Sequence, residues 1–380
     1  MKIKIVFFIS FLFFISLLNV KSQDISRKII NFPDINGYKT LKCDFHMHTV
    51  YSDGTVWPSF RVAEAWADGF DVIAITDHLG KSKYNHVNDT NFNENYEIAK
   101  PVADKLGIVL IKGSEITMKY PYGHYNALFL KDINLVDKSN CVEDLTAAKD
   151  QGAFIIWNHP GWKMKDEIPL WDSIPGILLK KVLINGIELV NYTSYYPLAF
   201  TWAAEKKLTA FAGSDIHNPA TAEFDYMNGS HRPMTLVFAK DTSQVSIKDA
   251  LEQHRTVVYY DNFLLGSEEY LAALFNASVV VQNPSFSIDA DSDNNYFNHI
   301  RIQNNSSVDY ELELSAADKI LKVSDKVILK ANTVTVLDIK PTPRDITGEK
   351  EYVLKYKVKN LLSSPGTGII VDFPIKIKFL

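Results

Sequence analysis

The alternation of short apolar runs with helical stretches, from residue 41 to residue 275, is the feature that most constrains the fold of this chain. Residues 71–76 (Asp-Val-Ile-Ala-Ile-Thr) form a nearly continuous apolar run, as expected of a strand buried on both faces of a parallel sheet. The helical stretch before it, residues 59–68, is bounded by Pro58 and Gly69. Alternation of this kind predicts right-handed βαβ units around a parallel sheet. The pattern repeats about seven times, which favours a closed barrel over an open sheet.

The same reasoning orders the other elements along the chain. Strands are expected at residues 41–45, 108–113, 124–130, 153–157, 186–190, 209–212, 234–239 and 256–260. Helices are expected at about residues 94–106, 142–151, 171–182, 197–207 and 266–276, with one more ending at Arg255. In barrels of this type the chemistry lies at the C-terminal ends of the strands.

Histidine and acidic residues gather at these strand ends. His46 and His48 follow the first strand, and residues i and i+2 of an extended chain point to the same side. Asp215 and His217 repeat this spacing after a later strand. Six of the ten histidines occupy such positions, and histidines scattered through the core would not all fall next to strand ends. The full candidate set is His46, His48, Asp53, His78, Glu115, His124, His159, Asp215 and His217.

These side chains suit a metal centre. Imidazole together with carboxylate is the ligand combination of Zn, Mn or Fe. Nine groups exceed the needs of one ion and fit two or three divalent ions that share bridging carboxylates, a type of site that generates hydroxide at neutral pH. Taken singly, His124 also fits a hydrogen-bonded core histidine, and His159 also fits a turn residue before Pro160.

Other polar residues near the strand ends are candidates for supporting roles in catalysis. Asp77 is expected either to bond to a ligand imidazole and fix its tautomer or to cap its strand. Lys81, Lys83 and Arg232 are candidates for a phosphate-binding cation, and each also fits an ordinary solvated charge. Arg61, on the first helix, is expected to be structural. Candidates for an apolar mouth are Tyr84, Tyr120, Tyr122 and Tyr125.

Seven short motifs carry a resemblance to a known family. In order they are His-x-His-Thr (46–49), Ser-Asp-Gly (52–54), Thr-Asp-His (76–78), Gly-Ser-Glu (113–115), Gly-His (123–124), Asn-His-Pro (158–160) and Gly-Ser-Asp-Ile-His (213–217). This set resembles the polymerase and histidinol phosphatase (PHP) phosphoesterases over about residues 41–275. The resemblance implies a distorted (β/α)7 barrel with a trinuclear metal site and hydrolysis of phosphate esters. The expected nucleophile is a metal-bridging hydroxide that attacks phosphorus in line.

The resemblance also implies how the ligands divide among three ions. The first ion would take His46, His48, Glu115 and Asp215. The second would share Glu115 and add His124 and His159, and the third would take Asp53, His78 and His217. Many members carry histidine where this chain has Asp53, which leaves Mn and Fe open beside Zn. Three longer stretches, residues 52–58, 123–127 and 157–162, look like exported members of the family from Bacteroidetes-type bacteria.

Residues 1–22 have the pattern of a secretory signal peptide. Lys2 and Lys4 precede an uncharged run over residues 5–18, and Val20 and Ser22 fit the −3 and −1 places, so cleavage is expected before Gln23. The run is shorter than the roughly 20 apolar residues of a spanning helix, and an uncleaved anchor is the alternative. We therefore expect a periplasmic or secreted protein in which residues 23–40 form a leader segment before the barrel.

Cysteine content and charge narrow the function further. Two cysteines, Cys43 and Cys141, make no disulfide framework and are expected as free buried thiols, with a single pairing as the alternative. The formal charge is −5 and there is no basic stripe, which argues against binding of long nucleic acid but not of short fragments. No stable membrane partner is expected, and the sequence does not indicate an oligomeric state.

From residue 277 the pattern changes to short alternating runs separated by Asn, Asp, Ser, Gly and Pro. It predicts a smaller all-β, Ig-like antiparallel sandwich over residues 277–380, after a barrel over residues 41–276. Strands are expected at residues 279–281, 286–288, 299–302, 310–314, 326–329, 334–339, 352–358 and 375–379. Residues 289–293 resemble the start of a calcium loop but lack its glycine and its last acidic residue, which favours a solvated turn.

Together these features favour an exported metal-dependent phosphohydrolase that acts on small phosphate monoesters or diesters. A nuclease-like phosphodiesterase acting on short oligonucleotides is one alternative. Another is a surface binding protein in which the sandwich binds the partner and the barrel is a metal-stabilised scaffold. A third is hydrolysis of a non-phosphate substrate by the same hydroxide.

Overall fold

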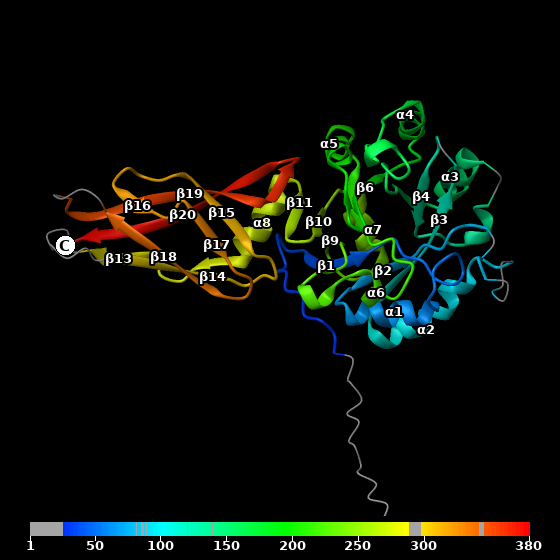
Figure 1. Cartoon of the computed structure of the whole chain (residues 1–380), viewed down its shortest axis with the longest axis horizontal. Helices are drawn as coiled ribbons and strands as arrows, with labels where there is room; N and C mark the ends of the chain where they lie inside the picture. The colour runs from blue at the N-terminus through cyan, green and yellow to red at the C-terminus, as the bar shows by residue number, and fades with distance from the viewer. Residues whose placement is uncertain are drawn as a thin grey trace, which may run out of the picture.

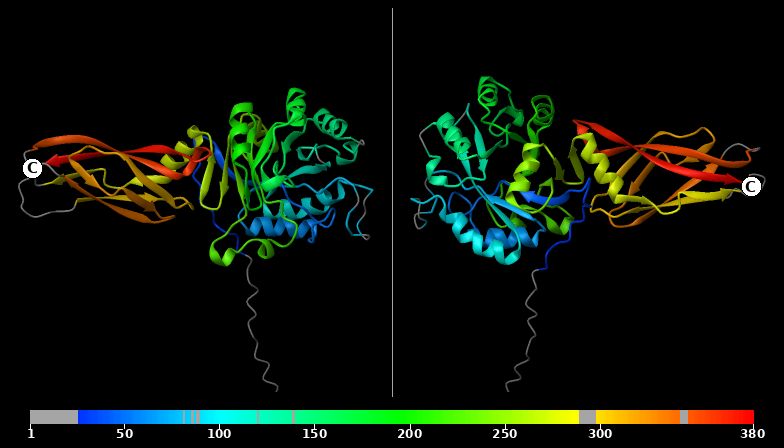
Figure 2. Two further views of the ribbon diagram at one scale, coloured as in Figure 1. Left: turned by 45° about the horizontal axis from the view of Figure 1, so that its top comes forward. Right: turned by 180° about the vertical axis from the view of Figure 1, so that it is seen from behind.

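The computed structural model describes residues 26–380 except 81, 85, 86, 88, 89, 120, 138, 139, 289–297 and 342–345. An α/β barrel and an elongated β domain lie end to end along the long axis (Figure 1; Figure 2 shows two further views). The expected signal peptide, Lys81, Tyr120 and the calcium-like stretch lie outside the described residues. Within the described part of the chain, no helix has both the length and the apolar character needed to cross a membrane.

Seven strands of the barrel follow one another in the order β1, β2, β3, β4, β5, β6 and β8. Their bounds are β1 Lys39–Asp44, β2 Val72–Ile75, β3 Val109–Thr117, β4 His124–Leu128, β5 Phe154–Trp157, β6 Gly186–Asn191 and β8 Thr209–Gly213. The short β7 (Ser194–Tyr195) pairs with β6. The ring closes just beyond β8 and β1, where the amide of Asp215 donates to the carbonyl of His46 and the amide of His48 donates to the carbonyl of Ile216. The predicted distorted barrel is therefore confirmed.

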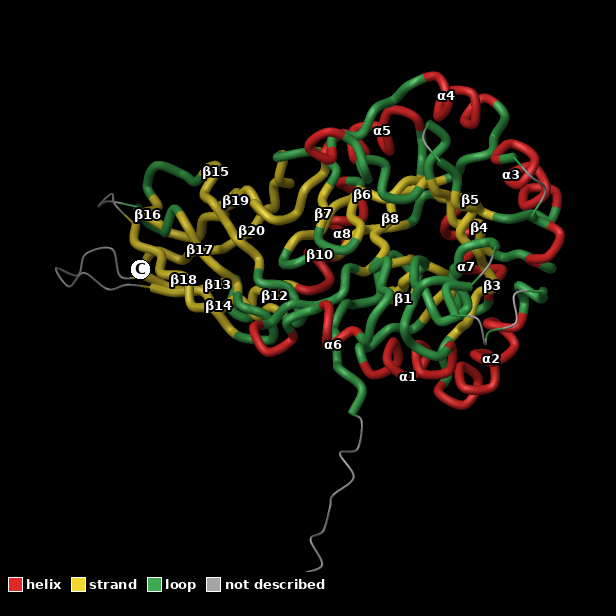
Figure 3. The backbone as a smooth tube through the Cα atoms, turned by 45° about the vertical axis from the view of Figure 1, so that its right-hand side comes forward, coloured by secondary structure: helices red, strands yellow, loops and turns green. Residues whose placement is uncertain are grey.

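Most of the helices lie on the outside of these strands (Figure 3), and the last one lies between the barrel and the C-terminal β domain. Their bounds are α1 Pro58–Ala67, α2 Glu94–Leu106, α3 Cys141–Asp150, α4 Ser173–Lys180, α5 Pro197–Lys206, α6 Ala220–Glu223, α7 Gln244–Glu252 and α8 Glu268–Ser278. The described residues also form the 3₁₀ turns η1 Ile133–Leu135, η2 Lys165–Glu167 and η3 Tyr226–Asn228. Local chemistry sets several ends, because α1 starts on a proline, which suits the first turn, and α2 ends at Gly107 with φ +72°.

The direction of β4 differs from the all-parallel sheet that the sequence predicts. β4 runs antiparallel to both β3 and β5. Only six residues separate the end of β3 from the start of β4, and a parallel connection needs about a dozen or more. His124 is the first residue of β4, as the expected strand over residues 124–130 has it, and the antiparallel course of β4 places it at the same edge of the barrel as Glu115.

Three further antiparallel strands extend the sheet away from β1. β9 (Met234–Ala239) pairs with β1, β10 (Thr256–Tyr260) pairs with β9, and β11 (Phe263–Gly266) pairs with β10. β11 was not predicted, because it is short and separated from β10 by only two residues.

The C-terminal region is the predicted sandwich. One sheet contains β13, β20, β19, β15 and β17, and the other has the order β12-β14-β18-β16. Their bounds are β12 Val279–Val281, β13 Ser285–Ile288, β14 Asn298–Asn304, β15 Tyr310–Ala316, β16 Leu321–Val323, β17 Lys326–Leu329, β18 Val334–Pro341, β19 Gly348–Ser364 and β20 Thr367–Phe379. The sequence missed β16 and predicted only parts of the long β19–β20 hairpin.

A shared sheet joins the two regions. Leu264 and Leu265 of β11 pair in parallel with Leu361 and Leu362 of β19. Helix α8 packs against both β19 and β20, and the ring of its Phe275 contacts Tyr310 of the sandwich at 4.9 Å between centroids. Barrel and sandwich are therefore built around one continuous sheet and share buried contacts.

Candidate metal centre

The nine predicted ligand side chains converge on one edge of the barrel. His46 and His48 follow β1, with Asp53 in the same loop; His78 follows β2 and Glu115 lies within β3. The remaining four are His124 at the start of β4, His159 after β5, and Asp215 and His217 after β8. Each has a nitrogen or carboxylate oxygen within 4.0 Å of such an atom in another member.

Glu115 lies in the middle of the cluster and is 1% exposed. Its Oε1 lies 3.1 Å from Nδ1 of His124 and 3.4 Å from Nε2 of His159. Its Oε2 lies 2.8 Å from Nδ1 of His78 and 3.4 Å from Nε2 of His48. One carboxylate thus faces two sides of the site, the geometry expected of a bridging ligand.

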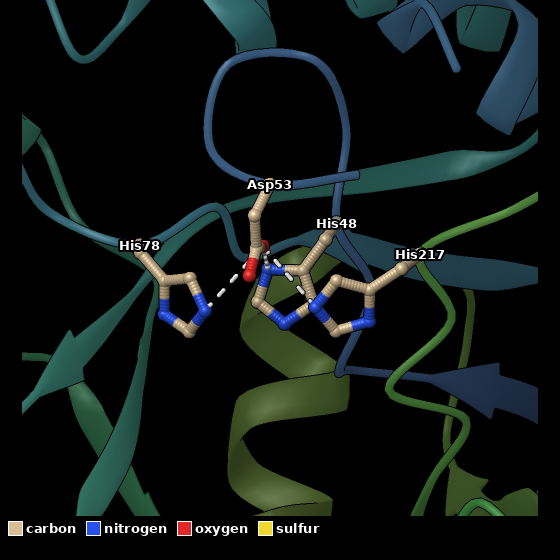
Figure 4. Close-up of side chains that lie close together, drawn as sticks. All are labelled: His48, Asp53, His78 and His217. Carbon is tan, nitrogen blue, oxygen red and sulfur yellow. Dashed lines mark ion pairs between the residues drawn. The ribbon is translucent and has the colours of Figure 1, made fainter. Parts of the chain in front are cut away.

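Asp215 and Asp53 organise the rest of the site. Oδ1 of Asp215 lies 3.2 Å from Nε2 of His46 and 3.1 Å from Nε2 of His48. Oδ1 of Asp53 lies 3.1 Å from Nε2 of His217 and 3.5 Å from Nε2 of His78, and the three imidazoles of His48, His78 and His217 surround this carboxylate in Figure 4.

The ligand atoms fall into three overlapping groups, within each of which all atoms lie within 4.8 Å of one another. These are His46, His48 and Asp215; His46, Glu115 and His159; and His48, Asp53, His78 and His217. The grouping differs from the division implied by the family resemblance. His48 belongs with Asp53 as well as with Asp215, Glu115 groups with His46 and His159 but not with Asp215, and His124 belongs to none of the three groups. The ring of His48 also stacks on that of His217, at 4.3 Å between centroids.

Unpaired buried atoms indicate that these residues fit metal ions. Nε2 of His46, Nε2 of His48, Oδ1 of Asp53 and Oε2 of Glu115 are buried and make no hydrogen bond of suitable geometry, although another ligand atom lies 2.8–3.2 Å from each of them. Buried polar atoms are almost always bonded, and leaving one unpaired costs about 1–3 kcal/mol. Four such atoms on one cluster of imidazoles and carboxylates are accounted for if each donates a lone pair to a divalent ion.

The charges of the cluster favour ionised carboxylates. Burial raises the pKa of Glu115, but His46, His78 and the other imidazoles lower it more, so that this pKa lies well below its usual range. The pKa of Asp215 is lowered in the same way by His46 and His48 against the effect of burial. Both side chains are therefore carboxylates at neutral pH, the form that binds metal.

Glu188, in the middle of β6, orients His46 and was not predicted from the sequence. Its Oε1 lies 2.7 Å from Nδ1 of His46, and its Oε2 accepts from the amide of His159 at 2.7 Å. A proton on Nδ1 of His46 leaves the Nε2 lone pair directed at the cluster. Gly213 makes this approach possible, because a Cβ there would lie 2.2 Å from Glu188 Oε1 and 2.8 Å from His46 Cβ. The one sequence signal was an acidic residue inside an apolar strand.

Asp77 acts on an imidazole indirectly. It accepts bonds from the amide and hydroxyl of Thr49, from Oγ of Ser52 and from Nδ2 of Asn95. Because Ser52 donates to Asp77, its oxygen is free to accept from Nδ1 of His48 at 3.3 Å. The expected direct bond between Asp77 and a ligand imidazole is therefore wrong, and Ser52 stands between them.

Arg232 does not have the position expected of a phosphate-binding cation. It is 1% exposed, and its guanidinium pairs with Asp44 and, at 3.4 Å, with Asp68. Asp44, a residue that the sequence analysis missed, accepts from the amides of His46 and Ser214, both at 3.2 Å. The charge of Arg232 is thus neutralised in the core. Through Asp44, Arg232 supports the main chain that carries His46.

Arg61 has the structural role expected for it. The buried guanidinium donates to the carbonyls of His48 (3.0 Å), His217 (3.1 Å) and Asn218 (3.0 Å) and pairs with Glu64. These bonds hold the loop after β1 against the segment after β8, so two ligand-bearing segments keep their relative positions.

Fold and site together define a metal-binding α/β barrel with a fused sandwich. Residues 44–171 match the PHP domain, and residues 285–374 match an Ig-like domain. The chain is similar to the crystal structure of a two-domain protein from Bacteroides vulgatus that contains a predicted PHP-like metal-dependent phosphoesterase. The two chains share 35% sequence identity with a TM-score of 0.84, over 92% of this chain and 99% of that chain. The chain belongs to the PHP family.

A second solved structure, a putative metal-dependent phosphoesterase from Bifidobacterium adolescentis, shares 17% identity with a TM-score of 0.37 over 47% of this chain and 88% of that chain. At this level of similarity no conclusion rests on it. Among curated proteins, none matches the chain.

Proposed function

We propose that this protein is a metal-dependent phosphoesterase that hydrolyses small phosphate monoesters or diesters at a centre of two or three divalent transition metal ions (Zn, Mn or Fe). The observation that carries the proposal is the convergence, on one carboxylate–imidazole cluster, of four buried ligand atoms that make no hydrogen bond of suitable geometry. Membership of the PHP family supports a phosphoric ester as the substrate.

The nine clustered side chains would hold the ions. Divalent ions in such a site lower the pKa of water and neutralise the charge that develops on the transferring phosphoryl group. The protein prepares the site before substrate arrives: Glu188 and Ser52 fix the protonated nitrogens of His46 and His48, and the carbonyl of Asp215 accepts from Nδ1 of His217 at 2.7 Å. Each of these imidazoles consequently presents Nε2 to the cluster.

The phosphate-binding role of Lys81 stays a proposal, because this residue lies outside the described part of the chain. The formal charge of −5 favours small esters or short oligonucleotide fragments over a long polyanion. We further propose that the protein works in the periplasm or outside the cell after cleavage before Gln23. N-terminal sequencing of the exported protein tests this, and a first residue of Met1 contradicts it.

Elemental analysis combined with kinetics tests the function. Protein purified without chelators should contain two to three transition metal ions per chain and should hydrolyse ethyl phosphate or a dialkyl phosphate diester. Replacing His159 or Asp215 with alanine should remove turnover while leaving the circular dichroism spectrum unchanged. Failure to bind Zn, Mn or Fe even after reconstitution would show that the assignment is wrong. Two or more bound ions without turnover of any phosphate ester would favour the scaffold or the non-phosphate alternative.

A further inference from the structure

A pocket with mostly apolar walls adjoins the metal cluster on the side of His124 and His159. These two ligands and Asn158, whose Nδ2 donates to Glu115 at 2.8 Å, form one wall. The other walls come mainly from Met118, Tyr122, Trp157, Pro160, Trp162 and Met164. The pocket has a volume of about 110 Å³, below the roughly 300–1,000 Å³ typical of sites for whole drug-sized ligands, so it takes a small part of a ligand.

Trp162 is the exposed part of this pocket. It is 45% exposed, although its ring lies 4.8 Å from the ring of His124 and 5.3 Å from that of His159, measured between centroids. Its amide donates to the carbonyl of His159 at 2.9 Å, so pocket wall and ligand belong to the same turn. An indole left open to solvent beside a charged cluster offers a flat apolar surface within reach of any group bound there.

Trp157 gives the pocket a rigid base. It is 5% exposed, stacks on Trp202 at 6.0 Å and meets Trp171 edge-to-face at 5.9 Å. Because these rings are packed behind the pocket, its shape is fixed before a ligand enters. Lys163 also lines the pocket, and its Nζ lies 3.8 Å from the centre of the Trp162 ring, which holds one face of the indole in place.

We infer that this pocket binds a flat aromatic group on the alcohol side of the substrate, so the preferred substrates are phosphate esters whose alcohol carries an aromatic ring. The inference rests on the proposed function, because a phosphoryl group on the cluster directs the ester's organic part along the adjoining walls. An aromatic ring matches a wall of two indoles, a phenol and two thioethers through stacking, edge contacts and sulfur–aromatic contacts.

Binding of phosphonates tests the pocket separately from catalysis. Methylphosphonate and benzylphosphonate carry the same charged head and differ in the aromatic ring. Calorimetric titration of the metal-loaded protein should show about tenfold tighter binding of benzylphosphonate, and Trp162→Ala should reduce this preference to about twofold. Trp162→Phe should keep most of the preference. Leu170→Ala is the matched control, because Leu170 is 53% exposed in the same segment but does not line the pocket.

Hydrolysis of a matched ester pair provides the second readout. Ethyl phosphate and 2-phenylethyl phosphate have similar leaving groups, so a difference in kcat/KM reports on the ring and not on bond reactivity. Equal affinities for the two phosphonates, or a preference that Trp162→Ala leaves intact, would overturn the pocket assignment while turnover of ethyl phosphate still supports the proposed function. Trp162-dependent binding without turnover of either ester would support the pocket and contradict the phosphoesterase assignment. Absence of both binding and turnover would overturn both.

Discussion

Replacing Glu188 with glutamine should weaken metal binding although the change removes only a charge and keeps the side-chain size. Oε1 faces Nδ1 of His46, and Oε2 accepts from the amide of His159 and from Nδ2 of Asn191 at 3.0 Å. The NH2 group of a glutamine must take the place of one of these two oxygens. In place of Oε2 it opposes the backbone N–H of His159. In place of Oε1 it donates to Nδ1 of His46, which moves the proton of this imidazole to Nε2, the nitrogen that faces the cluster.

The size of the effect follows from the role of such partners in metal sites. Replacing a residue that orients a ligand histidine costs about 10–100-fold in metal affinity, or roughly 1.4–2.7 kcal/mol of binding free energy. The loss of metal affinity is measured directly by competition between the Glu188→Gln variant and a chelating indicator for Zn or Mn. Turnover at saturating metal shows whether the remaining defect lies in affinity alone.

Asp68→Asn provides the matched control. Asp68 is also a buried carboxylate, but it pairs with Lys28 and Arg232 and accepts from the hydroxyl of Tyr226 at 2.7 Å, away from the ligand atoms. The Asp68→Asn variant should have a lower unfolding temperature than wild type and a metal affinity within twofold of wild type. If Glu188→Gln binds metal as tightly as wild type, the argument that Glu188 sets the tautomer of His46 is refuted.

Three further changes test other parts of the structure. Gly213→Ala should reduce metal affinity at least tenfold, because its Cβ would overlap Glu188 and His46. Gly176→Ala should retain wild-type affinity, because its Cβ meets only an ordinary contact at 3.7 Å. Equal metal affinities of the two variants would contradict the packing argument. Arg232→Met should lower the free energy of unfolding in urea by about 3–5 kcal/mol, because it leaves the carboxylate of Asp44 buried without its ion-pair partner. A raised KM at unchanged stability would instead support a phosphate-binding role for Arg232. Burial raises the pKa of Cys43 well above its usual range and that of Cys141 to about 12. Ellman's reagent should therefore label neither thiol in the native protein at pH 8 and both thiols in guanidinium. Fewer than two labelled thiols after denaturation would indicate a disulfide.

Periodicity predicted most of the barrel, because strands buried on both faces read as continuous apolar runs. The direction of a strand is not encoded in such a run, so the antiparallel course of β4 became clear only from its pairing with β3 and β5. The long β19–β20 hairpin was underestimated. The alternating pattern was recognised at Leu354, Tyr356 and Val358 but not at Ile369, Val371 and Phe373, where the exposed Ile370 and the nearby Pro374 obscure it.

The candidate ligands were predictable because they lie in short motifs at or near strand ends, whereas their partners were not. Asp44 and Arg232 are 188 residues apart in sequence, so nothing in the sequence around either residue shows that the two pair. Glu188 lies within a strand, where an acidic residue usually faces solvent, and only the folded barrel brings it to His46 and His159. Polar pairs across a core depend on tertiary packing, which local sequence does not specify.

The pairing of β11 with β19 has a consequence for the order in which the protein is made. Leu264 and Leu265 leave the ribosome almost a hundred residues before the strand that covers them, Leu361 and Leu362. Until then the nascent barrel carries an apolar strand with one row of unpaired N–H and C=O groups, the type of edge that recruits other chains into aggregates. The sandwich thus protects the barrel from self-association, and a chain that stops short of β19 leaves this edge open however completely the metal-binding half has folded.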